Sequence, residues 1–98
     1  MRDRGGSTTE QSGTEQTAVF DLLSDETRLA IVTELDRARR DGEADGLRFS
    51  TLRGRVGAAD SGRFNYHLKK LRGTLVRKDG DHYVLTPTGV RMAATVTD

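Results

Sequence analysis

Residues 50–72 read STLRGRVGAADSGRFNYHLKKLR, and their pattern predicts two helices joined by a turn. Ser50 is a favourable N-cap for a short helix that ends at Val56, because its hydroxyl can accept a bond from a free backbone N–H group. Gly57 supplies the left-handed backbone that commonly ends a helix. After the turn at residues 57–60, Asp60 or Ser61 caps a longer helix that runs to about residue 72. Its apolar stripe at i, i+4 and i+7 consists of Phe64, Leu68 and Leu71. Two short helices joined by a glycine-containing turn indicate a helix-turn-helix.

The residues that follow predict a β-hairpin and a last helix. Residues 75–78 and 81–85 are two apolar, β-prone runs around Asp79-Gly80, which is a strong hairpin signal. A hairpin in this place, next to a helix-turn-helix, is a wing. Pro87 suits the first turn of a further helix. The inner face of that helix is expected to carry Val90, Ala93 and Ala94.

Two helices and a short strand are predicted upstream. Apolar residues at spacings of three and four predict a short helix over residues 14–23. Ser24 as N-cap, followed by two acids in the first turn, predicts a second helix over about residues 25–40. A turn rich in Gly, Asp and Glu then leads into a strand of two or three residues at 47–49.

Taken together, these elements form one domain at residues 14–98. Residues 1–13 show no apolar periodicity, so we expect them to form a disordered tail. The predicted fold class is α+β, mostly α, a winged helix-turn-helix with a two-stranded β-hairpin wing. A core of this size depends on local helix packing or on a partner subunit.

The composition excludes several classes of protein. The chain has no Cys, so disulfides and thiolate metal sites are absent. No apolar run approaches the ~20 residues of a membrane span, and the N-terminus lacks the apolar stretch of a secretory signal. We therefore expect a cytoplasmic protein without membrane contact. No paired acid and base, activated nucleophile or phosphate-binding glycine loop occurs at a suggestive spacing, so neither an enzyme activity nor a cofactor is expected.

Positive charge is concentrated in one segment. Residues 47–78 contain nine Lys and Arg residues against the single Asp60, a balance of +8, whereas the whole chain carries only +1. The remaining residues therefore sum to −7. A basic segment in an otherwise acidic chain suits recognition of one polyanion by one face, although a basic surface that is merely solvated has the same composition.

Three stretches carry a resemblance to a known family: residues 22–32 (LLSDETRLAIV), 64–71 (FNYHLKKL) and 75–89 (LVRKDGDHYVLTPTG). With the order of elements, they resemble the ArsR-like winged helix-turn-helix transcriptional regulators, especially archaeal members. The resemblance implies a homodimer formed by the first and last helices. The residues that would form the dimer interface are Ala18, Val19, Leu22, Val90, Ala93 and Ala94. Metal-sensing members of the family use Cys-rich sites or clusters of His and acids, and this chain has no Cys and two His, so no metal site is expected.

The second helix of the helix-turn-helix has an outward face suited to DNA. Projected at 100° per residue, it turns Gly62, Arg63, Tyr66, Lys69 and Lys70 outward, with Asn65 on the flank. Base edges in a major groove would be read by Ser61, Arg63, Asn65 and Tyr66, and phosphates would be bound by Lys69 and Lys70. Other phosphate or minor-groove contacts would come from Thr51, Arg53, Arg77 and Lys78.

Several of these residues also have purely structural explanations. Tyr66 is able to pack against a neighbouring helix and Asn65 to form a local hydrogen bond. Arg77 and Lys78 would also protect a hairpin edge from pairing with other chains. His67 lies beside the inward stripe and is expected to take a hydrogen-bonded packing role, while His82 is expected to be a solvated wing residue.

The predicted function is sequence-specific binding of double-stranded DNA by a transcriptional regulator, with repression the expected mode. The helix at 61–72 would read the major groove, and the wing at 75–85 would contact the backbone or minor groove. One alternative is a winged-helix module that binds protein within an assembly, since folds of this kind also serve that role. Another is that the chain is the DNA-binding portion of a longer regulator.

Overall fold

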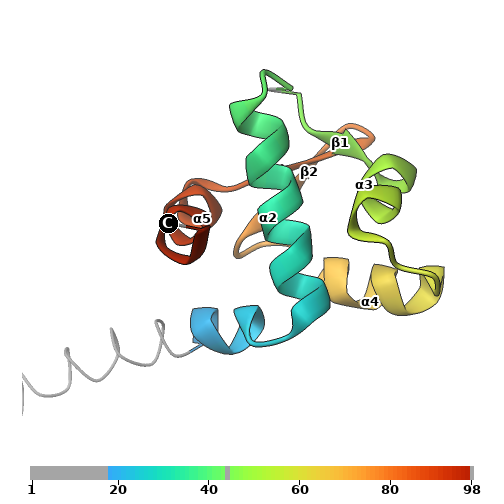
Figure 1. The fold of residues 1–98 in the computed structure, drawn as a ribbon, viewed down its shortest axis with the longest axis horizontal. Coiled ribbons are helices and arrows are strands. Elements are labelled where there is room, and N and C mark those ends of the chain that lie inside the picture. Colours follow the sequence, from blue (N-terminus) through green and yellow to red (C-terminus); the bar gives the residue numbers. More distant parts are fainter. Residues whose placement is uncertain (1–17, 44, 98) are drawn as a thin grey trace, which may run out of the picture.

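A computed structural model describes residues 18–43 and 45–97 of the chain. A helical segment at residues 18–23 is followed by α2 (Glu26–Arg40), β1 (Leu47–Arg48), α3 (Phe49–Val56), α4 (Ser61–Leu71), β2 (Val76–Asp79), β3 (His82–Leu85) and α5 (Pro87–Thr97). Helix α2 runs through the middle of the molecule, with α5 on one side and α3 and α4 on the other (Figure 1). The expected tail and residues 14–17 of the expected first helix lie outside the described residues.

The fold is α+β, mostly helical, and it is the predicted winged helix-turn-helix. The hairpin of β2 and β3 is antiparallel, and β1 joins it as a third strand in the order β1-β3-β2. The predicted short strand is confirmed at Leu47–Arg48, whereas Phe49 already belongs to α3. No helix in the described ranges is long and apolar enough to span a membrane.

The wing turn lies one residue later than the sequence indicated. Asp79 pairs with His82 across the two strands, so the two loop residues are Gly80 and Asp81 rather than Asp79 and Gly80. The favoured two-residue hairpin loops need a positive φ at their first position. Gly80 meets that requirement with a φ of 65°, which draws Asp79 into the strand.

Two predicted helix caps are wrong, and one is confirmed. The N-cap of α2 is Asp25 rather than Ser24, and the Ser24 hydroxyl instead donates to the carbonyl of Asp21 at 2.7 Å. The N-cap of α3 is Arg48 rather than Ser50, and its side chain makes no capping hydrogen bond. The chain passes directly from β1 into α3, which places Ser50 inside the first turn. The cap of α4 is Asp60, whose carboxylate accepts from the backbone N–H of Arg63 at 3.0 Å.

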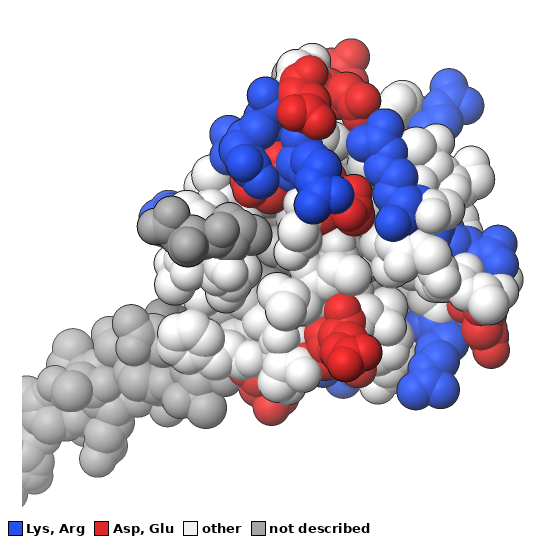
Figure 2. Space-filling view, viewed as in Figure 1, with Lys and Arg blue, Asp and Glu red and all other residues white. Residues whose placement is uncertain are grey.

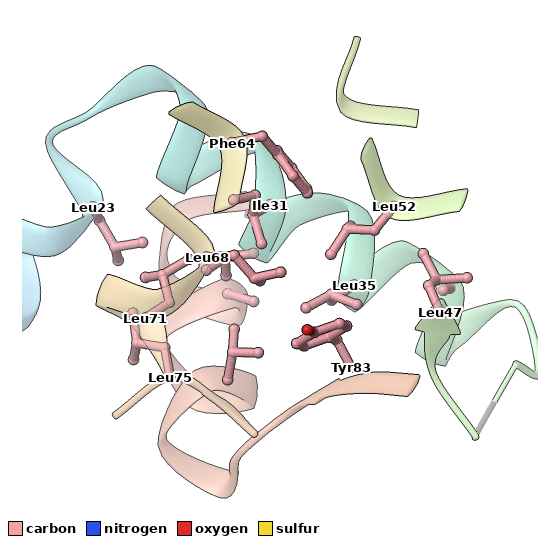
Figure 3. Close-up of a cluster of buried hydrophobic side chains, with 14 residues drawn as sticks. Leu23, Ile31, Leu35, Leu47, Leu52, Phe64, Leu68, Leu71, Leu75 and Tyr83 are labelled. Atoms are coloured by element: carbon pink, nitrogen blue, oxygen red, sulfur yellow. The ribbon is translucent and has the colours of Figure 1, made fainter. Parts of the chain in front are cut away.

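The hydrophobic core gathers around α2 (Figure 3). Ile31 and Leu35 of α2 meet side chains from α3, α4, the wing and α5, including the predicted stripe Phe64, Leu68 and Leu71, all of which are buried. Phe64 also packs edge-on against Phe49, with ring centroids 5.2 Å apart. Burial of a large apolar side chain contributes about 1.5–3 kcal/mol. The orientation of α4 is therefore fixed by its inner face, which determines the residues that its outer face presents.

Candidate nucleic-acid interface

Helix α4 has one buried and one exposed side. Phe64, His67, Leu68 and Leu71 are buried, whereas Ser61, Gly62, Arg63, Tyr66, Lys69 and Lys70 are exposed, and Asn65 is half-buried. This is the division that the helical projection predicts. The exposed side holds hydroxyls, an amide at its edge and three cations, and no residue of α4 is acidic. Its side chains therefore offer hydrogen-bond donors and acceptors together with uncompensated positive charge.

Within the described residues, the cations of α4 form no ion pair with an acid, whereas several cations on other elements do. Six arginines on other elements form ion pairs with Asp or Glu: Arg37, Arg39, Arg40, Arg48, Arg55 and Arg77. In contrast, Arg63, Lys69, Lys70 and Arg72, the C-cap of α4, form no ion pair with any acid in the described part of the chain. Figure 2 shows ion-paired side chains around the C-terminal end of α2, where blue and red side chains lie next to one another. The sequence count of nine basic residues could not distinguish these two groups.

Tyr66 stands on the exposed side of α4 and is 55% exposed. The ammonium of Lys70 lies 5.6 Å from the centre of its ring, within range of a cation–π contact. The ring is therefore not packed against a neighbouring helix, the structural alternative considered for it. An exposed aromatic ring among cations is a suitable contact for a base edge or a thymine methyl group.

The start of α3 presents backbone donors beside an exposed hydroxyl. Because the Arg48 side chain does not cap α3, the first N–H groups of this helix receive no side-chain acceptor from their N-cap. Thr51 is exposed in the first turn. Backbone N–H groups at a helix N-terminus favour a phosphate oxygen.

Arg53 has a structural role that sequence reasoning missed. Its Nε donates to the carbonyl of Ala58 at 2.9 Å and its Nη2 to that of Ala59 at 2.6 Å. Gly57, with a φ of 80°, ends α3 as predicted, and the Arg53 guanidinium then holds the turn that leads into α4. The guanidinium of Arg53 is therefore already engaged in the turn that positions α4. Nothing in residue spacing indicates this bond, because the acceptors are carbonyls.

The wing carries compensated charge. Arg77 Nη1 lies 3.7 Å from an Asp79 oxygen, and the Lys78 ammonium lies 5.8 Å from the centre of the Tyr83 ring. Arg48 on β1 lies 3.6 Å from Asp81, and this guanidinium holds the pKa of Asp81 below its ordinary value. His82 Nδ1 lies 2.9 Å from the same carboxylate. The wing therefore has the acids Asp79 and Asp81 beside its basic residues, whereas α4 contains no acid.

The expected dimer residues divide into three groups. Val19 and Leu22 are half-buried and pack on the core of their own chain, and Val90 is half-buried as well. Ala93 is fully buried inside that core, which leaves none of its side chain exposed on the surface of the single chain. Ala18 and Ala94 are exposed. Sequence reasoning did not select the two large apolar side chains exposed here, Phe20 at 54% and Val96 at 41%.

The described residues contain no group of three or more His, Cys, Asp or Glu side chains able to hold a metal ion. Of the two histidines, His67 is buried and hydrogen-bonded, as predicted, and His82 is half-exposed on the wing.

Two helices joined by the Gly57 turn, followed by a hairpin packed beside them, define the chain as a winged helix-turn-helix protein. Residues 16–96 match the family described as Domain of unknown function (DUF7347), and the chain belongs to this family. No curated protein and no solved structure matches the chain.

Proposed function

We propose that this protein binds double-stranded DNA in a sequence-specific manner and regulates transcription, with α4 in the major groove. One observation carries the proposal: the four cations at the exposed side and C-terminal end of α4 lack acidic partners among the described residues, whereas six arginines elsewhere are paired. Free cations on one helix face attract phosphates without competition from an internal acid.

The side chains on the outer side of α4 take two different roles in this proposal. Ser61, Arg63, Asn65 and Tyr66 lie in the first half of the helix, which enters the groove, and they would contact base edges. Lys69 and Lys70, one turn later, would bind phosphates on the groove wall. Thr51 and the N-terminal N–H groups of α3 would bind the backbone. Arg77 would contribute less, because it is already paired with Asp79 on the wing, whereas Lys78 forms no ion pair with an acid in the described part of the chain.

The ArsR-like resemblance and the exposed apolar side chains support a homodimer as part of the proposal. Phe20 on the helical segment 18–23 and Val96 on α5 are exposed, and Ala18 and Ala94 lie near them in sequence on the same two elements. In Figure 2 the side of the molecule where these elements lie shows few charged side chains outside the grey atoms. A dimer that presents two α4 helices would read two half-sites about 34 Å apart, in a palindromic operator.

The test is fluorescence anisotropy with mixed-sequence duplex DNA between about 50 and 300 mM salt. Wild-type affinity is expected to fall steeply with salt. In the variant Lys69→Gln/Lys70→Gln, the slope of log K against log salt should become less steep by about 2, since each phosphate contact contributes about −0.9 to that slope. Lys69→Glu/Lys70→Glu should abolish binding.

The matched control is Arg37→Glu/Arg91→Glu, which changes the net charge equally but on α2 and α5. Both positions are exposed, and Arg37 is already paired with Glu34. Retained binding by this variant and lost binding by the α4 variant would assign the interaction to α4. If folded wild-type protein fails to bind even at low salt, the DNA proposal is wrong. The exposed Tyr66 among cations would then favour a protein-binding module.

A further inference from the structure

His67 belongs to α4 but points away from its exposed side. The residue is only 6% exposed, and it and Asp36 are the polar side chains most deeply buried in the described part of the chain. Its neighbour Tyr66 is exposed, with the two rings edge to face and their centroids 5.2 Å apart. A change at His67 therefore lies one residue from the candidate base-reading surface.

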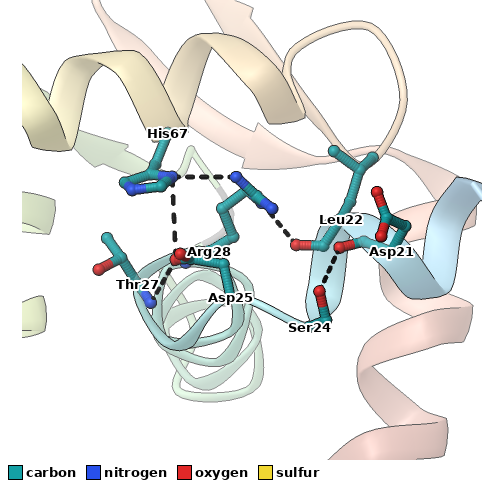
Figure 4. Close-up of polar contacts among 7 residues, drawn as sticks. All are labelled: Asp21, Leu22, Ser24, Asp25, Thr27, Arg28 and His67. Carbon is teal, nitrogen blue, oxygen red and sulfur yellow. Dashed lines mark hydrogen bonds and ion pairs between the residues drawn. The ribbon is translucent and has the colours of Figure 1, made fainter.

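Arg28 connects His67 to two other parts of the fold (Figure 4). Its Nη1 lies 3.1 Å from His67 Nδ1, and its Nε donates to the carbonyl of Leu22 at 2.6 Å. Leu22 lies in the helical segment 18–23, Arg28 in α2 and His67 in α4. One guanidinium thus links the proposed dimerisation segment to the proposed DNA-reading helix.

Asp25 completes the cluster and approaches the same ring nitrogen of His67 as Arg28 does. Its Oδ1 accepts from the backbone N–H groups of Thr27 at 2.8 Å and Arg28 at 3.1 Å, and it lies 3.8 Å from His67 Nδ1. The hydrogen bond from Arg28 N–H holds the pKa of Asp25 below its ordinary value, so this carboxylate is charged at neutral pH. The imidazole nitrogen therefore stands between a cation and an anion.

The protonation state of His67 decides which of these two groups it binds. Arg28 can only donate, so Nδ1 accepts from it only while that nitrogen carries no proton. A protonated ring would donate from Nδ1, repel the guanidinium and turn to Asp25. Histidine is the side chain that changes charge between about pH 5 and 8.

We propose that the Arg28–His67 pair is a proton-sensitive coupling that positions α4 relative to the helical segment 18–23. While Nδ1 of His67 carries no proton, Arg28 is bonded to both Leu22 and His67. In the protonated state, Arg28 loses His67, so the link from α4 through the guanidinium to Leu22 is broken and α4 is held at Asp25 instead. The consequence for DNA affinity rests on the proposed function, whereas the coupling itself does not.

Among the described residues, Arg28 and Asp25 are the charged groups that contact Nδ1 of His67. Arg28 belongs to α2, and Asp25 is the N-cap of that helix. Strand β2 also packs against α4, and its charged side chains, Arg77, Lys78 and Asp79, are exposed. Asp21 of the helical segment 18–23 is exposed, and its carbonyl binds Ser24. Neither of the two acids among these four, Asp79 and Asp21, forms an ion pair with His67 in the described part of the chain.

The first measurement follows the free protein by NMR between about pH 8 and 5. The amide of Leu23 shares its peptide group with the Leu22 carbonyl, so its shift reports the bond from Arg28. In the wild type, the chemical shift of this amide is expected to change with the same midpoint pH as the His67 ring. In His67→Asn, this change is expected to be absent. Asn keeps a hydrogen-bond acceptor near the position of Nδ1 but does not titrate. If the ring titrates while Leu23 does not move, or if the ring does not titrate in this range, the coupling is wrong.

The second measurement compares DNA affinity at about pH 8 and pH 5.5. Added positive charge alone would strengthen binding in acid. We expect the wild type to weaken about fivefold, the effect of one lost hydrogen bond, and His67→Asn not to weaken. The matched control is His82→Asn on the wing, which should weaken as the wild type does. If acid weakens His67→Asn equally, the coupling does not act on DNA binding. If the wild type binds no DNA at either pH, the proposed function fails and the NMR titration still decides the coupling.

Discussion

Gly46 shows how closely the loop before β1 approaches the wing. It has a φ of 89°, and a Cβ at this position would contact the carbonyl of Tyr83 and the side chain of Val84. Gly42 has nearly the same backbone, with a φ of 93°, but nothing lies within 4 Å of its Cβ position. Substitutions at these two glycines therefore separate the free-energy cost of a left-handed backbone from the free-energy cost of a steric clash.

We expect Gly46→Ala to lower the free energy of unfolding by about 3 kcal/mol and Gly42→Ala by about 1 kcal/mol. Left-handed backbone costs a non-glycine residue roughly 1–2 kcal/mol, and overpacking adds typically 1–3 kcal/mol. Urea denaturation of both variants measures the difference. Equal losses would mean that the loop moves away from β3 without cost.

Asp25 has both a capping and an electrostatic role, and these can be separated. We expect Asp25→Ala to lower the free energy of unfolding by about 1 kcal/mol at neutral pH, because the two capped N–H groups lose their acceptor. Asp25→Asn should cost much less, since Asn caps almost as well.

The pH dependence gives the sign of the charge effect. The pKa of Asp25 is lower in the folded protein, so its contribution is complete above the unfolded pKa and is lost as the pH falls through the folded value. Wild-type stability should therefore drop more steeply below about pH 4 than that of Asp25→Asn. Chemical denaturation across acid pH measures both curves, and parallel curves would contradict an ionic role for Asp25.

At the scale of elements, the turn between α3 and α4 depends on Arg53. We expect Arg53→Lys to lower the free energy of unfolding by about 1 kcal/mol, because an ammonium cannot reproduce both guanidinium bonds to Ala58 and Ala59. Arg55→Lys is the control, since Arg55 makes only a surface ion pair with Glu43. Thermal unfolding compares the two. An equal effect of both substitutions would remove the special role of Arg53.

The sequence predicted the elements better than the interactions between them. The stripe of Phe64, Leu68 and Leu71 follows from helical geometry, which is local, and the structure buries all three. The cap at Asp25 was misassigned because the neighbouring Ser24 is also a favourable N-cap. The pairing of Arg48 with Asp81 could not be predicted, because it arises only when β1 joins β3.

The candidate site was predicted to a similar extent. Helical projection identified the outward residues of α4, and the structure exposes them, with Asn65 at the edge. Projection could not show which cations are neutralised, since the acids that pair with Arg55 and Arg77 are selected by loop and strand geometry. The free charge on α4 is therefore a property of the tertiary structure.

At the scale of the whole molecule, the large exposed apolar side chains lie on different elements. Tyr66 is on α4, which carries the unpaired cations, whereas Phe20 and Val96 are on the helical segment 18–23 and α5. If the first belongs to a DNA interface and the other two to a dimer interface, substitutions at Tyr66 and Phe20 should have separable effects. Both side chains are more than half exposed, so neither substitution removes a buried group.

We expect Phe20→Glu to convert a dimer into a monomer, because a buried unpaired carboxylate in an apolar interface is costly. Sedimentation velocity over a range of concentrations measures this. The same variant should lose affinity for a palindromic duplex but keep the weak affinity for a single half-site, since each α4 is intact.

Tyr66→Glu should remain a dimer but lose affinity for both duplexes, because it places an acid among the free cations. A Phe20→Glu protein with unchanged mass would show that the segment 18–23 is not the contact between subunits. A monomeric wild type that binds only half-sites would remove the dimer from the proposal and leave the role of α4 intact.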